Sequence, residues 1–510
     1  MPQGGWLDKS RIVAPASYDR WLVPPAALAV HLSIGMAYGF SVFWLPLSRA
    51  IGVSAPAPDD WKISTLGWMY TLFFVFLGSS AAVFGRWVER EGPRKAGVVA
   101  AVCWGGGFFL SALGVRLHQI WLLWIGAGVI GGCGLGLGYI SPVSTLIKWF
   151  PDRRGLATGL AIMGFGGGAM IGTPLADALM KYFATPSSVG VWQTFVTMGA
   201  LYTLAIVAGA MAYRLPPAGW TPRASTPTGA SSAGPTTGAA PRSLPVNEAF
   251  ATRQFWLLWA VLCLNVTAGI GVLGMAVPMI QEVFKDRVTA SAAAGFAGLL
   301  SVFNILGRIA WASLSDVIGR RGTYTVFFAL GLMLYAAAPS LGHLGSAGAF
   351  VAVFCVILTM YGGGFATIPA YLADLFGPDH VGAIHGRLLT AWSTAGVLGP
   401  VLVNYLREFQ IARGVPNAAA YDGTMYILAA LLGLGFVCNW AITPLASRAR
   451  TTSSPELAAE TPVVDSSSGG VSVVPVDRHV GQLLLRWTLV LVPIAWGIYR
   501  TLVLAMQLFT

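Results

Sequence analysis

Residues 85–95 read Gly-Arg-Trp-Val-Glu-Arg-Glu-Gly-Pro-Arg-Lys, and residues 315–321 read Ser-Asp-Val-Ile-Gly-Arg-Arg. Both stretches contain an acidic residue, a glycine and an arginine, and the spacing between them is the same. A second loop repeats at the same offset of 227 positions, the distance from 89 to 316. The matched pairs are Glu89 and Asp316, Gly92 and Gly319, Arg94 and Arg321, Pro151 and Pro378, Asp152 and Asp379, Gly155 and Gly382, and Gly159 and Gly386. Ungapped agreement at two separate loops indicates an internal duplication.

The segments between these loops are long and apolar. Of the 510 residues, 55% are hydrophobic and 10% are charged, against about 25% charged in soluble proteins. The mean hydropathy is +0.69. Apolar windows long enough to cross a bilayer as helices recur at 22–48, 64–87, 95–116, 119–147, 156–181, 190–213, 255–284, 290–317, 322–342, 347–373, 381–407, 421–446 and 482–508. We therefore expect an all-α membrane protein with twelve spans and one further span.

The composition changes at two places that divide these spans. Residues 214–247 are dominated by Pro, Ala, Ser, Thr and Gly, and residues 447–480 are similar. Such segments behave as flexible connectors. The predicted parts are a cytoplasmic N-terminal segment (1–21), an N-terminal six-helix bundle (22–213), a flexible cytoplasmic linker (214–252), a C-terminal six-helix bundle (253–446), a second flexible linker (447–480) and an extra transmembrane helix (481–510). With the repeat, this division predicts two pseudo-symmetric bundles that rock about a substrate site at their interface.

The net charge of +11 is explained by membrane topology. A basic chain can indicate a nucleic-acid partner, but the cations fall mostly in alternate loops, as the positive-inside rule predicts. We therefore expect no nucleic-acid partner. The N-terminus and the repeated loops are expected in the cytoplasm, and the C-terminus outside.

No pattern in the sequence indicates a cofactor, a metal or catalysis. The five cysteines all lie in predicted spans and lack metal-ligand spacing. Glycine runs at 131–138, 164–168 and 362–364 also lie in spans, and no phosphate-binding ending follows them. Because no nucleophile, base or metal constellation is present, we expect a protein that is not an enzyme and needs no cofactor.

Arg308 lies within an apolar stretch, where a charge is costly. An arginine at the centre of a bilayer helix costs about 2.5–3.5 kcal/mol on insertion scales. Asp316 marks the end of the helix, which places Arg308 about 12 Å inside it, near the midplane. The repeat offset puts Ala81 at the equivalent position, so the shared scaffold does not require the charge. We interpret Arg308 as a substrate-binding residue; the alternative is an arginine held by neighbouring carbonyl groups.

The repeated loops, with the span count and the central linker, resemble the signature loops of the major facilitator superfamily. In such loops an acidic residue at a helix end faces basic residues and a neighbouring helix terminus, and forms a latch that breaks when the halves rock. The resemblance implies a conformational latch of Glu89, Arg90, Arg94, Asp316, Arg320 and Arg321. The alternative is that these charges only set the topology.

Five further segments resemble the oxalate/formate antiporter family, which is related to the monocarboxylate transporters. They are Tyr38-Gly-Phe-Ser-Val-Phe43, Lys148-Trp-Phe-Pro-Asp-Arg-Arg-Gly-Leu-Ala157, Gly164-Phe-Gly-Gly-Gly-Ala169, Phe303-Asn-Ile-Leu-Gly-Arg308 and Leu389-Thr-Ala-Trp-Ser-Thr-Ala-Gly396. That family exchanges small carboxylates, and its eighth-span arginine, which matches Arg308, binds the substrate carboxylate through a bidentate fork. The resemblance also implies an aromatic cage of Tyr38, Tyr139, Phe165, Tyr361, Phe365 and Trp392.

Two positions depart from these families and narrow the substrate. The oxalate-exchanging member has a second cation three residues after the eleventh-span tryptophan, where this chain has Ala395. The monocarboxylate transporters carry a proton-coupling aspartate one turn before the arginine, where this chain has Asn304, which can orient the guanidinium or donate to substrate but cannot take a proton. Because a dianion would keep an uncompensated charge, we predict monocarboxylates such as formate, lactate or pyruvate. His31 is a second possible proton site, but a structural histidine is the preferred interpretation.

Several alternatives stay open at this point. They are an oxalate/formate-type dicarboxylate exchanger, a proton-coupled monocarboxylate symporter and a carboxylate sensor that does not transport. The expected partners are a small carboxylate and the lipid bilayer of a bacterial inner membrane, and the chain is expected to act as a monomer. The last span resembles the single-span accessory peptide of some bacterial family members. We expect it to pack on the transporter core; an anchor for a missing partner is the alternative.

Overall fold

The structure is a computed structural model that describes all residues except 1–4, 223–242, 285–286, 289, 444–479 and 506–510. Most of the predicted second linker and the middle of the first lie outside the described residues. The α-helices are α1 (Pro24–Ile34), α2 (Trp44–Leu47), α3 (Ile63–Glu91), α4 (Pro93–Arg116), α5 (Ile120–Leu123), α6 (Gly132–Trp149), α7 (Arg154–Phe183), α8 (Val191–Ala212), α9 (Val246–Phe250), α10 (Arg253–Val283), α11 (Ala290–Ile318), α12 (Arg320–His343), α13 (Ala347–Phe376), α14 (Val381–Leu388), α15 (Thr390–Ala412), α16 (Asp422–Trp440) and α17 (Val480–Ala505). Four 3-10 helices, η1 (Lys9–Ile12), η2 (Arg20–Leu22), η3 (Gly35–Phe43) and η5 (Asn417–Ala419), and a π-helix, η4 (Trp124–Gly131), complete the described helices.

Twelve helical stretches among the described residues are long and apolar enough to cross a membrane. Each coincides with a predicted span, so the expected all-α membrane fold is confirmed. The predicted span at 381–407 is not among the twelve. It is built from α14 and α15, which meet at a break at Leu389. Polar residues such as Ser393 and Arg407 make α15 less apolar than the other spans, although it packs against α10 and α3 in the same way as they do.

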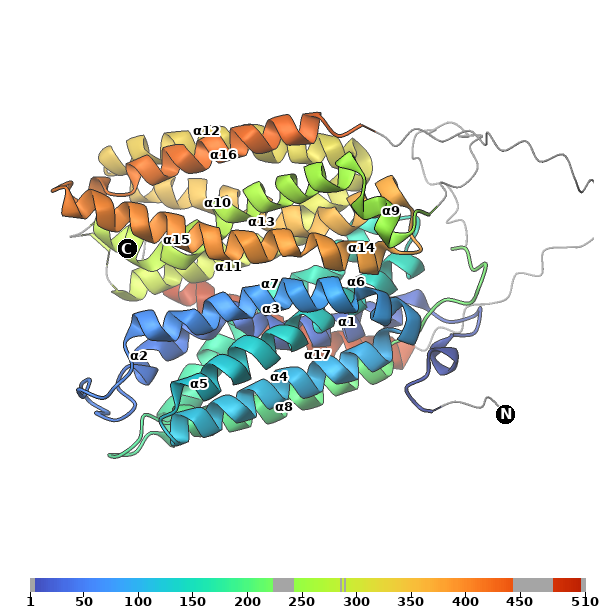
Figure 1. The fold of residues 1–510 in the computed structure, drawn as a ribbon, viewed down its shortest axis with the longest axis horizontal. Coiled ribbons are helices and arrows are strands. Elements are labelled where there is room, and N and C mark those ends of the chain that lie inside the picture. The colour runs from blue at the N-terminus through green and yellow to red at the C-terminus, as the bar shows by residue number, and fades with distance from the viewer. Residues whose placement is uncertain (1–4, 223–242, 285–286, 289, 444–479, 506–510) are drawn as a thin grey trace, which may run out of the picture.

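The helices form two groups that lie side by side, as Figure 1 shows. One group runs from α1 to α8 and the other from α10 to α16. Most helices pack mainly within their own group, whereas α14 packs mainly against α3 of the other group. The seam between the groups is formed by α3 against α14 and α15, and by α7 against α11 and α13. The predicted architecture of two pseudo-symmetric bundles is therefore confirmed. We call the two groups the N-terminal half and the C-terminal half.

The repeat is visible in how the seam is packed. A Cβ atom at Gly159 would lie 2.6 Å from the backbone oxygen of Arg308, and one at Gly386 would lie 2.1 Å from that of Ala81. Gly159 and Gly386 are equivalent at the repeat offset, and so are Arg308 and Ala81. In each half, therefore, a glycine packs against the backbone of the other half, and the two contacts are equivalent under the repeat. Such close helix contacts need residues without a side chain.

The first predicted span is helical but changes type along its length, from α1 through η3 to α2. At the change, Gly35 and Gly39 press against α7: a Cβ atom at Gly35 would lie 2.1 Å from the Phe165 carbonyl oxygen. The tight contact favours a local adjustment of the helix, and short 3-10 segments often mark such places. Tyr38 is carried by this segment and is therefore positioned by the contact with α7.

The extra helix α17 touches both halves. It packs against α1 and α7 of the N-terminal half and against α11 of the C-terminal half. Val490 and Ile494 of α17 join a buried apolar cluster with Met170 of α7 and Ile305 of α11. α17 therefore lies along the seam, on the side where α7 meets α11.

Candidate functional site

Arg308 is fully buried on α11 at the seam. Its Nε atom donates to the Asn304 Oδ1 atom at 2.9 Å, and its Nη1 atom donates to the Ile162 carbonyl oxygen of α7 at 3.0 Å. The Nη2 atom has no hydrogen-bond partner within the described residues. A neighbouring carbonyl therefore does hold the arginine in part, as the alternative interpretation expected. The guanidinium still keeps an unpaired donor, and buried unpaired donors are costly and rare.

The six aromatic residues expected around Arg308 come together in one cluster. The Trp392 ring is its hub, with ring centroids 4.5 Å from Phe365, 5.3 Å from Phe165, 5.3 Å from Tyr139 and 6.2 Å from Tyr38. Tyr361 lies 5.3 Å from Phe365. We call these six residues the aromatic cage. They come from η3, α6, α7, α13 and α15 and therefore join the two halves.

The cage surrounds the guanidinium with ring faces and hydroxyl groups. The Arg308 Cζ atom lies 5.6 Å from the centroid of Phe365 and 5.9 Å from that of Phe165, within the range of cation–π attraction. The Tyr38 and Tyr361 hydroxyl oxygens are 3.0 Å apart and share a hydrogen bond across the seam. Within the described residues, the Tyr139 hydroxyl and the Trp392 Nε1 atom have no partner. The site thus offers a cation and several unpaired donors in apolar surroundings, which suits a small anion with an apolar part.

A cavity of about 500 Å³ lies between the halves next to the cage. We call it the vestibule. Its lining runs from Tyr38, beside Arg308, along α15 to Glu408, and includes Trp44, Tyr70 and Leu273. Tyr70 and Glu408 lie toward the ends of α3 and α15 that are remote from the repeated loops. The halves are thus separated on the vestibule side of the cage.

On the other side of the cage, the repeated loops join the halves through two equivalent contacts. The Asp316 carboxylate accepts hydrogen bonds from the backbone N–H groups of Gly155, at 2.9 Å, and Leu156, at 3.1 Å, in the first turn of α7. The Glu89 carboxylate accepts from the Gly382 N–H at 3.1 Å, in the first turn of α14. Carboxylates at helix N-termini are stabilised by the free N–H groups and the helix dipole. Each half therefore caps a helix of the other.

The basic residues of the expected latch differ in their contacts. The Arg320 Nη2 atom bonds Asp316 at 2.6 Å, beside the seam. Arg90 pairs with Glu91, and Arg94 and Arg321 donate to backbone carbonyl oxygens of their own halves. The cation that pairs with Glu89 is instead Lys148 of α6, at 2.7 Å. Its place beside the second repeated loop was the signal that could have identified it.

Two buried histidines lie next to the cage. Both ring nitrogens of His31 on α1 face carbonyl oxygens: the Nδ1 atom faces Ala161, and the Nε2 atom faces Tyr139 at 3.2 Å. His385 on α14 has its ring centroid 5.8 Å from that of Tyr139, and neither of its nitrogens has a partner within the described residues. His385 approaches Tyr139 because α14 packs against α6, a contact that the sequence does not reveal.

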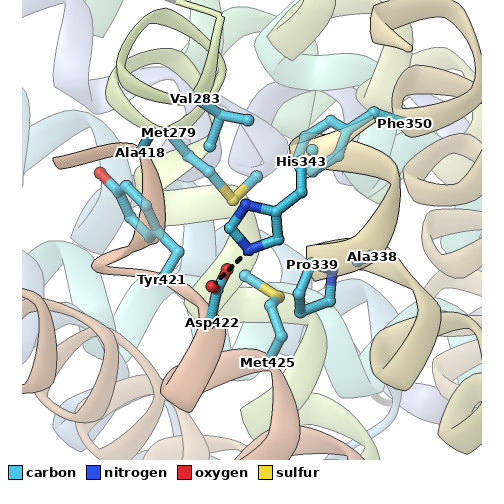
Figure 2. Close-up of a pocket in the computed structure, with 11 residues that line it drawn as sticks. Met279, Val283, Ala338, Pro339, His343, Phe350, Ala418, Tyr421, Asp422 and Met425 are labelled. Carbon is cyan, nitrogen blue, oxygen red and sulfur yellow. Dashed lines mark hydrogen bonds and ion pairs between the residues drawn. The ribbon is translucent and has the colours of Figure 1, made fainter. Parts of the chain in front are cut away.

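A separate small cavity of about 30 Å³ lies within the C-terminal half. Figure 2 shows His343 pointing toward Asp422 among apolar side chains, with the His343 Nε2 atom 2.8 Å from the carboxylate. The lining comes from α10, α12, α13 and the start of α16, and includes none of the expected site residues. Within the described part of the chain, no group of three or more His, Cys, Asp or Glu side chains is placed to hold a metal. The aromatic cage is therefore the candidate site.

Comparisons with known proteins identify a family and several relatives. A family model described as Major Facilitator Superfamily matches residues 26–400. The MFS-type transporter YhjX of Escherichia coli (strain K12) is 26% identical over 76% of this chain and 88% of its own length. The oxalate:formate antiporter of Oxalobacter formigenes is 25% identical over 75% of this chain and 83% of its own length. Apicoplast pyruvate carrier 1 of Toxoplasma gondii is 26% identical over 78% of each chain.

Among solved structures, the fold resembles that of FucP. The crystal structure of this transporter in the outward conformation matches with a TM-score of 0.58 and 14% sequence identity. The match covers 84% of this chain and 100% of FucP. At this identity the likeness concerns the fold alone.

Proposed function

The chain belongs to the major facilitator superfamily, and on that premise we propose that it transports small organic carboxylates by alternating access between its two halves. It is a multi-pass membrane transporter and not an enzyme. The proposed membrane is the bacterial inner membrane, with the N-terminus in the cytoplasm and the C-terminus outside. The units that rock are residues 22–213 and 253–446, and the repeated loops lie on the cytoplasmic side.

The observation that carries the proposal is the unpaired Nη2 atom of Arg308 inside the aromatic cage. A carboxylate bound there would accept hydrogen bonds from the guanidinium and cancel its charge. Asn304 accepts a hydrogen bond from the Arg308 Nε atom and so orients the guanidinium group. The cage supplies apolar walls, and the unpaired Tyr139 hydroxyl and Trp392 Nε1 atom supply donors for a keto or hydroxyl oxygen. The substrate-binding residues we propose are Arg308, Asn304, Tyr38, Tyr139, Phe165, Tyr361, Phe365 and Trp392.

The charge of the cage favours monocarboxylates. Ala395 is buried at the place where a second cation would stand, and Arg308 is the one cation that contacts the cage within the described residues. A bound monocarboxylate leaves the pair neutral, whereas a dianion would bury an unpaired charge. The relatives named above include a pyruvate carrier and an oxalate:formate antiporter. We favour substrates of the pyruvate, lactate or formate type over oxalate for this reason.

The two ends of the seam suggest how the substrate crosses. In the proposed orientation the vestibule faces outward and the helix caps of Glu89 and Asp316 lie on the cytoplasmic side of the cage, so we assign the structure to an outward-facing state. Return to the inward-facing state requires both caps to break. We therefore propose that Glu89, Asp316, Arg320 and Lys148 form the latch of this transporter. The contacts of Arg90, Arg94 and Arg321 suit a supporting role within each half.

Pyruvate counterflow in proteoliposomes tests this function. Vesicles that hold purified protein and unlabelled pyruvate should take up labelled pyruvate. Arg308→Gln should lower the rate by about 100-fold, as expected when one partner of a buried charge pair is lost. Arg308→Lys keeps the positive charge but loses the planar guanidinium group. Its counterflow rate should lie between those of the wild type and Arg308→Gln.

Arg413→Gln is the matched control, because Arg413 lies at the end of α15, with its Cζ atom 4.1 Å from the Phe409 ring centroid and away from the cage. Its counterflow should equal that of the wild type. Undiminished counterflow by Arg308→Gln would rule out the proposed site. Binding of pyruvate without any counterflow would favour the sensor over the transporter.

A further inference from the structure

His31 sits in an unusual hydrogen-bonding environment for a histidine inside a membrane helix. It is fully buried, and its two ring nitrogens face the carbonyl oxygens of Ala161 on α7 and Tyr139 on α6. Both carbonyl groups can only accept hydrogen bonds. A neutral imidazole has a single N–H group and can satisfy only one of them. The other contact then brings a nitrogen lone pair against a carbonyl oxygen.

A protonated imidazole fits the same environment without conflict. The imidazolium ion carries an N–H group on each nitrogen and would donate to both carbonyl oxygens. Hydrogen bonds from a charged donor are shorter and stronger than those from a neutral one. The scaffold around His31 therefore offers an acceptor to each N–H group of a protonated ring, and the cost of a buried charge opposes this protonation.

Burial makes up most of that cost, and the positive charge of Arg308 adds to it. The ionisable groups that face His31 are Tyr139 of α6, Arg308 of α11 and His385 of α14, and no carboxylate interacts with it within the described residues. Arg486 of α17 donates to Tyr18 and Leu22, which both precede α1. With the cage empty, burial and the positive charge of Arg308 both oppose protonation of His31. A carboxylate on Arg308 would cancel the second effect.

The two groups are also joined by one short piece of backbone. His31 contacts the carbonyl oxygen of Ala161, and Arg308 donates to that of Ile162, the next residue of α7. Phe165, one turn further on, contacts both side chains: its ring centroid is 6.5 Å from that of His31 and 5.9 Å from the Arg308 Cζ atom. A ligand that shifts Arg308 or this turn therefore acts directly on the contacts of His31.

We infer that His31 binds the proton that accompanies the carboxylate, so that this protein is a proton-coupled symporter. The inference rests on the proposed carboxylate site at Arg308. In the empty carrier, Arg308 is charged and His31 is neutral, so the buried charge is +1. In the loaded carrier, the carboxylate cancels Arg308 and the proton from the external solution resides on His31, so the buried charge is again +1. Both forms can then cross the closed state at a similar electrostatic cost, and by linkage each ligand raises the affinity for the other.

His385 provides a matched control. It is as buried as His31 and also lies beside Tyr139. Neither of its nitrogens has a partner within the described residues, so a proton there would leave two buried N–H groups without acceptors. The inference therefore assigns the proton to His31 and not to His385.

Pyruvate uptake into empty proteoliposomes tests the coupling. Vesicles at internal pH 7.5 are diluted into labelled pyruvate at pH 5.5, and compared with vesicles at pH 5.5 on both sides. A gradient of two pH units can support about 100-fold accumulation in 1:1 symport, because each unit corresponds to a factor of ten. Wild type and His385→Gln should be strongly stimulated by the gradient. His31→Gln, which keeps a donor but cannot take a proton, should still exchange pyruvate at equal pH and show a stimulation ratio of about 1.

The possible failures have different meanings. If the wild type exchanges pyruvate but the gradient has no effect, the coupling is wrong and the proposed function stands. If no exchange occurs in any vesicle, the proposed function itself fails. Full stimulation of His31→Gln, or loss of stimulation in His385→Gln, would overturn the assignment to His31.

A binding measurement covers the case of a variant that cannot transport. In weakly buffered detergent solution, wild-type protein should take up about one proton for each pyruvate bound, and His31→Gln should take up none. Equal proton uptake by both proteins would overturn the inference. A His31→Gln protein that folds but no longer binds pyruvate would also overturn it, because His31 would then belong to the anion site or the scaffold.

Discussion

At the end of the molecule that carries the repeated loops, the two halves make equivalent contacts with each other. Glu89 caps α14 and Asp316 caps α7, and the four partners are related by the repeat offset. In the cage the halves differ. Arg308 has Ala81 as its counterpart in the N-terminal half.

His31 is asymmetric in the same way, because the equivalent position in the C-terminal half holds the buried, apolar Leu258. The contacts that form and break in the proposed cycle are thus symmetric, and the proposed binding groups Arg308 and His31 are not. This difference suggests that the duplicated scaffold supplies the proposed motion, while changes at single positions, one in each half, supply the proposed chemistry.

The largest expected effect comes from adding a side chain at a symmetric seam contact. In Gly386→Val, the new Cβ atom would approach the Ala81 carbonyl oxygen to 2.1 Å, so the helices must separate. Overpacking of this kind costs about 1–3 kcal/mol. We expect the population of molecules with an open seam to rise by up to about 100-fold. Gly159→Val at the equivalent contact should behave alike.

The readout is the maleimide labelling rate of Ser144→Cys, a nearly buried position close to Gly382, in a protein without the five native cysteines. Gly106→Val is the control, because a Cβ atom at Gly106 meets nothing within 4 Å. Unchanged labelling of Ser144→Cys in both seam variants would contradict the close packing of the halves.

The helix caps should give the next largest effect. Glu89→Gln and Asp316→Asn each remove a charged acceptor from a helix N-terminus, and hydrogen bonds to charged groups contribute about 1.5–3 kcal/mol. We expect each variant to raise the same labelling rate by about tenfold, and the two effects to be similar because the contacts are equivalent. Arg90→Gln, outside the caps, should leave the rate unchanged. A large effect of one cap and none of the other would break the symmetry argument.

A second cation in the cage should change selectivity by a smaller amount. Ala395→Lys would place an ammonium group on α15, three residues from Trp392, where it can pair with the second charge of a dianion. Competition of oxalate against labelled pyruvate should improve by about tenfold, as expected for one added ion pair at an intermediate dielectric. Ala395→Met, of similar length without charge, is the control. If both variants favour oxalate equally, charge does not set the selectivity.

The smallest effect concerns a loop ion pair of the N-terminal half. Arg20 bonds Asp152 at 2.6 Å. Burial raises the pKa of Asp152, but the hydrogen bond and charge of Arg20 outweigh burial and hold this pKa below its usual range. The pair therefore stabilises the protein above the unfolded pKa of about 3.9, and the stabilisation is lost as the pH falls through the lower folded value.

Asp152→Asn should lower stability at pH 7 by only about 0.5 kcal/mol, because both groups are partly exposed. Thermal unfolding should show a small decrease in Tm at pH 7 and a smaller one near pH 3. Asp379→Asn, the repeat equivalent, makes no ion pair within the described residues and should show no decrease. A decrease that grows toward acid pH would contradict the assignment.

Much of this architecture follows from sequence patterns. Hydropathy and the repeated loops predict the helices and their division into halves, because a bilayer requires long apolar segments. The cost of a buried charge identifies Arg308, and the resemblance supplies the aromatic positions that the structure brings together around it. These features depend on periodicity, charge and spacing, all of which the chain displays locally.

Other features depend on contacts between helices and were not predicted. The change from α1 to η3 follows from the contact of Gly35 with α7, and the break at Leu389 divides a span expected to be continuous. Arg94 is explained by carbonyl oxygens near the end of α8, which no local pattern reveals. The two acceptors around His31 likewise come from α6 and α7. Partners of this kind become visible only once the helices are packed.

Direct binding of pyruvate tests the role of Arg308 without transport or vesicles. Titration calorimetry compares purified wild type, Arg308→Gln and Arg413→Gln in the same detergent. We expect one pyruvate bound per wild-type and Arg413→Gln chain, and an affinity at least about 100-fold weaker for Arg308→Gln. Equal affinity of wild type and Arg308→Gln would show that the anion binds elsewhere and would contradict the account.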